Sequence, residues 1–324
     1  MSLQSRREFT KLALAALPAA GLLSSIRTLG AAERPAKAKT GAAGVHVGLN
    51  VPYSFGNPSM SGDEVLQNCV KLGLDAVELR TQPVEAFLGA PVNLLNAKAA
   101  VAVGGAAVSN AEQLRQWRRT APMARLAEFR QKYEAAGILI EIVKVDGIFK
   151  MSEAELDYVF TLGQALGARA LSTEISKEAD EAKNDANHKR VGQFADQHKL
   201  MIGYHGHATT TPEHWERAFA LAKYNAANVD LGHFVAGNNT SPVPFIKKYH
   251  ERIPHVHVKD RKMNNGINVP FGEGDTPIAE VLRLIRDNRW NIQATIEFEY
   301  KVPAGSDRMT ELARTVKFCR QALA

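Results

Sequence analysis

Eight short runs of β-branched and other apolar residues alternate with longer helical segments along most of this chain. The runs are Val45–Val51, Ala76–Arg80, Ile138–Val145, Ala168–Glu174, Leu200–His205, Ala227–Leu231, Ile253–Val258 and Ala294–Glu299. Strands that alternate with helices pair in parallel through right-handed crossovers, and eight such units are enough to close a sheet on itself. The sequence therefore predicts an α/β fold, a (β/α)8 barrel, over residues 45–324.

One connection is longer than this unit requires. Residues 81–137 separate the second strand from the third, where a crossover takes about 30 residues. The segment contains an apolar run, Ala99–Val108, and a helical pattern from Ala111 to Ala136. We predict an insertion after the second strand that acts as a lid. The alternative is a strand within Ala99–Val108, which requires one of the other strand assignments to be wrong.

The N-terminus has the order of features found in an export signal. Arg6 and Arg7 precede a weakly apolar run, Leu12–Ile26, and small residues follow at 30–32. Paired arginines before such a run are typical of the twin-arginine route, and the run is too short to cross a membrane as a helix. We predict a signal peptide over 1–32, a linker over 33–44, recognition by the twin-arginine export machinery and a periplasmic location. The alternative is an amphipathic helix that carries the arginine pair by chance.

The distribution of charge argues against a nucleic-acid partner. The formal net charge is +6. Residues 1–40 contain seven basic and two acidic side chains, and they account for five of these six charges. The rest of the chain is close to neutral, so it lacks the basic surface that a phosphate backbone requires.

Ionisable residues close most of the predicted strands, and the later strands carry a dense set of them. The set is Glu174, His205, His207, Asp230, His233, His255, His257, Lys259, Asp260, Glu297 and Glu299. In a β/α barrel the active site forms at the carboxyl ends of the strands. Such crowding is costly unless a cation or hydrogen bonds neutralise it. A shell of carboxylates and imidazoles suits one divalent ion, Mn²⁺, Zn²⁺, Co²⁺ or Fe²⁺, and suits Mg²⁺ less.

Two histidines of the seventh strand, His255 and His257, share one face because side chains alternate along a strand. His257 is nearer to the carboxyl end of the strand. We therefore predict His257 as a metal ligand and His255 as a packing residue or a support behind the ligand.

Three further motifs each have two interpretations. Lys259-Asp260 is either part of the site or a surface ion pair. Glu78 and Arg80, at the end of the second strand, either contact the substrate or form a salt bridge at the barrel mouth. The segment 272–275, Gly-Glu-Gly-Asp, is either a binding loop or a turn before the next helix.

Taken together, four pieces of sequence resemble a known family. They are Asp230-x-x-His233, His255-Val-His257-Val-Lys259-Asp260, Gly272-Glu273-Gly274-Asp275 and Glu297. The set resembles the xylose isomerase-like TIM barrel superfamily, in particular its sugar (phosphate) isomerase/epimerase branch. The resemblance covers residues 45–324 and is strongest after Glu174. It implies a Glu-Asp-His-Glu metal site, with substrate oxygens bound to the metal and proton transfer next to a carbonyl group.

The resemblance also implies roles for individual residues. Asp230, His257 and Glu297 match three of the four metal ligands. The fourth ligand is open, because this chain has His205 where many members have a glutamate, and Glu174 closes the strand before it. We favour Glu174 as the fourth ligand and keep His205 as the alternative. Catalytic roles are expected for Glu174, His205, His207 and Glu297, and substrate contacts for His233, Lys259 and Glu299.

The sequence thus predicts an exported, divalent-metal-dependent sugar isomerase or epimerase. Its substrate is expected to be a small carbohydrate, namely a free sugar, a keto-sugar or a 3-keto-glycoside, because phosphorylated sugars are mainly cytoplasmic. No arginine matches the one that some epimerases carry after the metal histidine; Arg261 and Lys262 are the nearest cations. The alternatives are a 3-keto-glycoside lyase or hydrolase on the same site and an inactive carbohydrate-binding barrel. A homo-oligomer is compatible with the sequence.

The positions of the two cysteines allow a prediction that depends on closure of the barrel. Cys69 lies on the predicted helix Asp63–Leu72 after the first strand, and Cys319 lies on the last helix, about Asp307–Ala322. First and last helices are neighbours in a closed barrel. Both cysteines fall on apolar stripes, so we predict two buried free thiols on adjacent helices.

Overall fold

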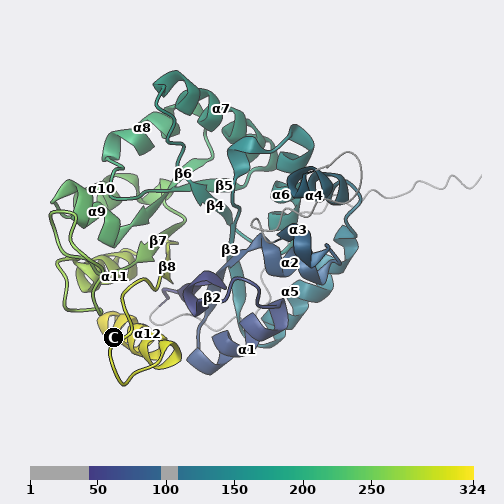
Figure 1. Cartoon of the computed structure of the whole chain (residues 1–324). Helices are drawn as coiled ribbons and strands as arrows, with labels where there is room; N and C mark the ends of the chain where they lie inside the picture. The colour runs from purple at the N-terminus through teal and green to yellow at the C-terminus, as the bar shows by residue number, and fades with distance from the viewer. Residues whose placement is uncertain (1–43, 96–108) are drawn as a thin grey trace, which may run out of the picture. The chain divides into compact units, whose positions relative to one another are not determined.

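The computed structural model of this chain describes residues 44–95 and 109–324. Within them, eight parallel strands pair in chain order and form a closed barrel, and β8 returns to pair with β1 (Figure 1). The predicted (β/α)8 barrel is confirmed. The predicted signal peptide (1–32), the linker up to residue 43 and the apolar run Ala99–Val108 lie outside the described residues.

All eight predicted strands are present, with ends that differ by up to three residues. They are β1 Val47–Val51, β2 Ala76–Arg80, β3 Leu139–Lys144, β4 Ala170–Glu174, β5 Met201–His205, β6 Asn225–Asp230, β7 His255–Val258 and β8 Gln293–Ile296. The eighth strand ends at Ile296 rather than Glu299, so Glu297 and Glu299 lie on the loop that follows it. The strand ladder therefore needs no contribution from 99–108.

Helices surround the strands on the outside (Figure 1). They are α1 Gly62–Leu72, α2 Thr81–Phe87, α3 Val92–Leu95, α4 Asn110–Arg118, α5 Leu126–Ala135, α6 Glu153–Ala165, α7 Glu181–His198, α8 Pro212–Leu221, α9 Leu231–Asn238, α10 Val243–Tyr249, α11 Ile278–Asp287 and α12 Arg308–Leu323. Short 3-10 turns occur at η1 Tyr53–Phe55, η2 Met123–Arg125, η3 Ile148–Lys150 and η4 His250–Arg252. None of the helices in the described ranges is long and apolar enough to cross a membrane.

The insertion after β2 contains α2, α3 and α4 before α5 leads into β3. The single helix predicted over 111–136 is wrong, because α4 ends at Arg118 and α5 begins only at Leu126. Pro122 lies in the gap; it has no amide hydrogen to donate and it disfavours helical backbone in the residue before it. Arg118 joins α4 to α2 and to the barrel helix α6, since its guanidinium lies 2.8 Å from Glu85 on α2 and 3.1 Å from Glu155 on α6.

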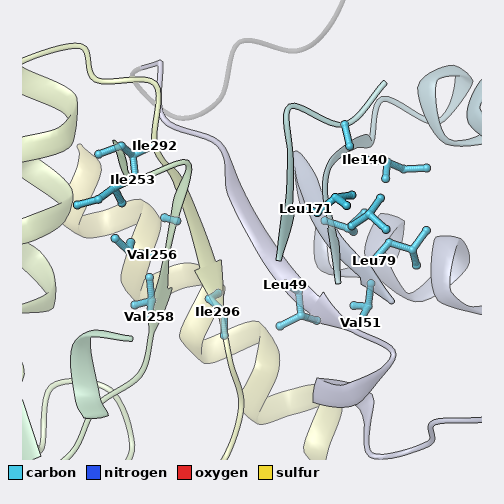
Figure 2. Packing of buried hydrophobic residues seen from close by; sticks show 14 of the residues in the cluster. Leu49, Val51, Leu79, Ile140, Leu171, Ile253, Val256, Val258, Ile292 and Ile296 are labelled. Atoms are coloured by element: carbon cyan, nitrogen blue, oxygen red, sulfur yellow. The ribbon is translucent and has the colours of Figure 1, made fainter. Parts of the chain in front are cut away.

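The two faces of the strands differ in chemistry. Residues that face the helices are apolar, and Figure 2 labels Leu49, Val51, Leu79, Ile140, Leu171, Ile253, Val256, Val258, Ile292 and Ile296 in this packing. Each such side chain contributes roughly 1.5–3 kcal/mol when fully buried. Alternate residues face the barrel interior and many are polar: Glu78 of β2 contacts His257 of β7, and these strands are not neighbours in the barrel. The apolar shell thus stabilises the fold around a buried polar interior.

Cys69 and Cys319 are both free and buried. They lie on α1 and α12, which pack against each other beside the β1–β8 seam (Figure 1). The prediction of two buried free thiols on adjacent helices is confirmed.

Candidate metal and active site

The candidate site lies at the carboxyl ends of β5 to β8, where each strand stops beside an ionisable residue. Asp230 ends β6 and also caps α9, because its Oδ1 accepts a hydrogen bond of 2.7 Å from the His233 backbone N–H. Gly232 lets this helix approach the segment after β7: a Cβ atom at Gly232 would lie 2.9 Å from the Lys259 carbonyl oxygen. One local motif therefore brings Asp230 and His233 to the barrel mouth together.

Four buried side chains converge there, namely His205, Asp230, His257 and Glu297, with one possible ligand atom from each within 4.8 Å of the others. Asp230 Oδ2 lies 3.4 Å from His205 Nε2 and 3.8 Å from His257 Nδ1. Glu297 Oε2 lies 3.9 Å from His205 Nε2 and 3.3 Å from His257 Nδ1. Metal–ligand bonds of about 2.1 Å in a tetrahedral site place the ligand atoms about 3.4 Å apart, so this set fits one divalent cation.

A buried carboxylate stands behind one of these residues. Glu78 Oε2 lies 2.5 Å from His257 Nε2, while His257 Nδ1, on the other side of the ring, makes no hydrogen bond with any described residue. A histidine whose second nitrogen is held by a carboxylate is the usual arrangement of a metal ligand. Burial by itself lowers the pKa of His257, but the charges of Glu78 and Glu297 outweigh it and raise this pKa to about 10.

His255 shares the inner face of β7 with His257 and lies two positions before it. Its Nε2 is 3.6 Å from Glu78 Oε1, and the ring is fully buried. Burial lowers the pKa of His255 to about 4, so the ring is neutral at pH 7.

Glu174 lies next to the group of four but outside it. Its carboxylate is 3.1 Å from His205 Nδ1, 2.6 Å from His207 Nε2 and 2.6 Å from Lys144 Nζ. Burial by itself raises the pKa of Glu174, but the hydrogen bonds from both histidines and the charge of Lys144 outweigh it, so the pKa is well below its usual value. Glu174 is thus ionised, and 47% of its side chain is exposed.

Lys259 is buried at the centre of the carboxylates. Its Nζ lies 3.1 Å from Asp230, 2.8 Å from Glu297 and 2.7 Å from Glu299. Burial opposes the charge, but these carboxylates raise the pKa of Lys259 above its usual value. The interpretation as a surface ion pair with Asp260 is wrong, because both side chains are buried and the ammonium pairs with three other carboxylates inside the mouth.

Asp260 instead organises the loop that follows. Its carboxylate accepts hydrogen bonds from the backbone N–H groups of Gly272, Gly274 and Thr276, at 2.8, 3.0 and 3.2 Å. The segment 272–275 is therefore a turn held by Asp260.

His233 lies between two cations at the rim. Arg261 Nη1 is 2.6 Å from its Nδ1, and Lys259 Nζ is 3.1 Å from its Nε2. Burial lowers the pKa of His233 to about 4, although Asp230 opposes this effect.

Several residues or contacts of the site were not predicted from the sequence. Asn50 donates a 2.9 Å hydrogen bond to Glu297, and the Tyr53 hydroxyl donates one of 2.7 Å to Glu299. Lys144 pairs with Glu174 as described above, and Glu78, for which the sequence offered a substrate contact or a salt bridge at the barrel mouth, pairs with His257 instead. Asn50, Glu78 and Lys144 lie on β1, β2 and β3 among apolar neighbours, and the alternation of side chains along these strands was the available signal. Tyr53 lies on η1 and carried no such signal. Of the two roles considered for Arg80, the structure shows the salt bridge at the barrel mouth: Arg80 Nη1 lies 2.5 Å from Asp146 Oδ2.

Comparison with known proteins gives one family. A family model described as xylose isomerase-like TIM barrel matches residues 152–322, more than half of the chain. An inosose dehydratase of Clostridium botulinum (strain Eklund 17B / Type B) is 29% identical over 134 residues, which is 34% of this chain and 44% of that protein. The chain therefore matches less than half of this relative's length.

Solved structures agree with the fold. A xylose isomerase domain protein from Alicyclobacillus acidocaldarius has a TM-score of 0.61 at 15% identity, with 86% of this chain and 98% of that chain covered. A sugar phosphate isomerase/epimerase from Parabacteroides distasonis has a TM-score of 0.56 at 15% identity, with 84% and 96% covered. With a closed eight-stranded barrel and a family match over more than half of its length, this chain belongs to the xylose isomerase-like TIM barrel family.

Proposed function

We propose that this chain is a divalent-metal-dependent enzyme that removes the proton next to the carbonyl group of a sugar or keto-sugar. The observation that carries the proposal is the convergence of two imidazoles and two carboxylates at the carboxyl ends of β5 to β8. The carboxylate of Glu78 behind His257 supports it, because a histidine whose second nitrogen is held by a carboxylate is the usual arrangement of a metal ligand.

His205, Asp230, His257 and Glu297 hold the cation in this proposal. We favour His205 over Glu174 as the fourth ligand, because the Glu174 carboxylate contacts the far nitrogen of His205, His207 and Lys144 and lies outside the group of four. When bound, the cation supplies a positive charge that stabilises the negative charge developing on the substrate carbonyl oxygen. Two imidazoles and two carboxylates favour Zn²⁺, Co²⁺, Fe²⁺ or Mn²⁺ over Mg²⁺.

Glu174 is the candidate base in this scheme. It is ionised, it lies half-exposed at the mouth, and Lys144 and His205 fix its orientation. A carboxylate of low pKa is a weak base, so the reaction depends on charge stabilisation at the neighbouring oxygen to make the substrate proton acidic. His207, which touches the same carboxylate and is 42% exposed, can pass that proton onward.

The fate of the proton sets the reaction. Its return to the adjacent carbon gives isomerisation, and its return to the opposite face gives epimerisation, which are the outcomes we favour. Loss of a group from the next carbon gives elimination instead. The similarity to an inosose dehydratase favours this second candidate, a lyase acting on a keto-sugar or 3-keto-glycoside, and Lys259 is a buried ammonium beside the site that can assist the leaving group.

Metal analysis tests the proposal. Protein purified without chelators is expected to bind about one divalent ion per chain and to turn over an unphosphorylated sugar or keto-sugar from a panel of paired phosphorylated and free compounds. Asp230→Asn and His257→Gln should lose both properties. Far-UV circular dichroism should show that both variants keep the fold, although each loses one member of a buried ion pair and should melt at a lower temperature than wild type. Absence of metal in the wild-type protein would favour the inactive carbohydrate-binding barrel.

Export is a separate part of the proposal and rests on the N-terminal sequence. A reporter that follows residues 1–44 should accumulate in the periplasm of a bacterium with a twin-arginine system. The double substitution of Arg6→Lys and Arg7→Lys should retain the reporter in the cytoplasm. Equal export of both reporters would exclude the twin-arginine route.

A further inference from the structure

A second charged pair lies at the barrel mouth, where β2 and β3 end. Arg80 is the last residue of β2, and Asp146 follows the end of β3 by two positions. Arg80 Nη1 lies 2.5 Å from Asp146 Oδ2, and Gln82 Nε2 donates to the same oxygen at 3.3 Å. In the closed barrel, β2 and β3 lie opposite β6 and β7, which carry Asp230 and His257. The pair is therefore across the mouth from two of the candidate metal ligands.

The side chain of Arg80 belongs to the inner face of its strand. Side chains alternate along a strand, so Arg80 shares a face with Glu78, which contacts His257 inside the barrel. The Arg80 guanidinium lies over the Tyr53 ring, 5.1 Å from its centroid. The Tyr53 hydroxyl in turn donates to Glu299 beside the candidate metal site. A ligand that extends from the metal ligands toward β2 and β3 therefore meets this pair.

The pair offers a donor and an acceptor side by side. Arg80 Nη2 and Asp146 Oδ1 make no hydrogen bond with any described residue. The two side chains are 19% and 42% exposed. A sugar hydroxyl both accepts and donates, so it can accept from the guanidinium and donate to the carboxylate. A phosphate or carboxylate group is an acceptor that carries a negative charge, and the charge of Asp146 repels it.

We propose that Asp146 is a specificity-determining residue: it neutralises Arg80, so that this wall of the mouth binds hydroxyl groups of an uncharged sugar and rejects a phosphate or carboxylate. An arginine without such a partner is itself a common binder of phosphate and carboxylate groups. The selectivity thus comes from a charge that acts against the wrong ligand. The identity of the ligand as a sugar rests on the proposed function, but preference for charge is a property of binding and is measured without turnover.

Binding to the protein loaded with one equivalent of Zn²⁺ tests the proposal. The probes are D-fructose and D-psicose, their 6-phosphates, and 5-keto-D-gluconate, which carries a carboxylate. Isothermal titration calorimetry gives the Kd of each probe. The wild type should bind the free ketoses more tightly than the charged compounds by roughly ten-fold or more. Asp146→Asn should gain roughly ten-fold or more in affinity for the charged compounds, whereas Asp146→Glu, which keeps the charge, should retain the wild-type preference.

A double variant and a matched control assign the effect to this pair. Arg80→Met combined with Asp146→Asn should lose the gain, because the guanidinium that binds the anion is gone; a gain that persisted would come from the metal. Asp185→Asn is the matched control, since Asp185 also pairs with an arginine, Arg217, at 2.7 Å, but on the outer helices α7 and α8. It should leave the charge preference unchanged. Far-UV circular dichroism of each variant checks that the fold is retained.

The outcomes separate this proposal from the proposed function. Equal affinity of the wild type for free and charged ketoses, binding of neither free ketose, or an unchanged preference in Asp146→Asn would overturn the role of Asp146. The expected change of preference without turnover of any ketose would refute the proposed function and leave the role of Asp146 supported. Turnover together with an unchanged preference in Asp146→Asn would refute the role of Asp146 alone.

Discussion

The buried carboxylate of Glu78 gives the sharpest test of the metal site, because Glu78 reaches the site only through His257. The contact between Glu78 Oε2 and His257 Nε2 is 2.5 Å long, and both side chains are fully buried. Hydrogen bonds to a charged group contribute about 1.5–3 kcal/mol. Glu78→Gln keeps the shape and an acceptor oxygen but removes the charge.

We therefore expect Glu78→Gln to weaken metal binding roughly 10- to 100-fold, in keeping with the usual effect of losing a group that supports a ligand. The affinity is measured by competition with a coloured chelator, using Zn²⁺ and Co²⁺. The direct ligands remain in place, so some binding should persist, in contrast to the complete loss expected for Asp230→Asn.

Glu141→Gln is the matched control for this substitution. Glu141 is also a buried carboxylate beside an imidazole, 2.9 Å from His46 Nδ1, but it also lies 3.2 Å from Arg169 and belongs to none of the candidate metal groups. The metal affinity of the Glu141→Gln variant should stay within two-fold of wild type, even if the stability of this variant falls as much as that of Glu78→Gln. Wild-type affinity in Glu78→Gln, or equal losses in both variants, would refute the reasoning.

Three other outcomes are expected. Glu174→Gln should keep its metal and lose turnover if His205 is the fourth ligand, and elemental analysis of the purified variant decides this. Burial lowers the pKa of His188 from 6.5 to about 4. Between these two pH values the unfolded chain therefore binds more protons at this residue than the folded chain does. The neutral ring contributes about 3 kcal/mol at most to the free energy of unfolding, and this contribution is complete above pH 6.5 and is lost as the pH falls toward 4. His188→Gln should flatten that part of a urea-unfolding profile against pH, and an unchanged slope would contradict the assignment. Cys69 and Cys319 should not react with a thiol reagent in the native protein, and both should react after unfolding without reductant; fewer than two thiols would mean that they are oxidised.

The strands and most of the residues at their ends were predictable because both signals are local. A buried strand is a short β-branched run, and parallel strands with helical crossovers place all carboxyl ends on one side of a barrel. Asp230, His257 and Glu297 were therefore assigned to one mouth from their positions alone. The break between α4 and α5 was also available locally, in Pro122, and the long helical pattern on both sides obscured it.

Contacts across the barrel could not be read from the sequence. Glu78 and His257 are 179 positions apart on strands that are not neighbours, so their contact depends on the tilt and closure of the whole barrel. The sequence also could not decide between Glu174 and His205 as the fourth metal ligand. The ends of adjacent strands differ in height by only a few ångströms, so residue order alone does not say which side chain reaches the site. Lys259 looked like an exposed residue beside Asp260, and only the folded mouth shows three carboxylates around its ammonium group. Sequence determines which groups reach the mouth, whereas the closed barrel decides which of them meet.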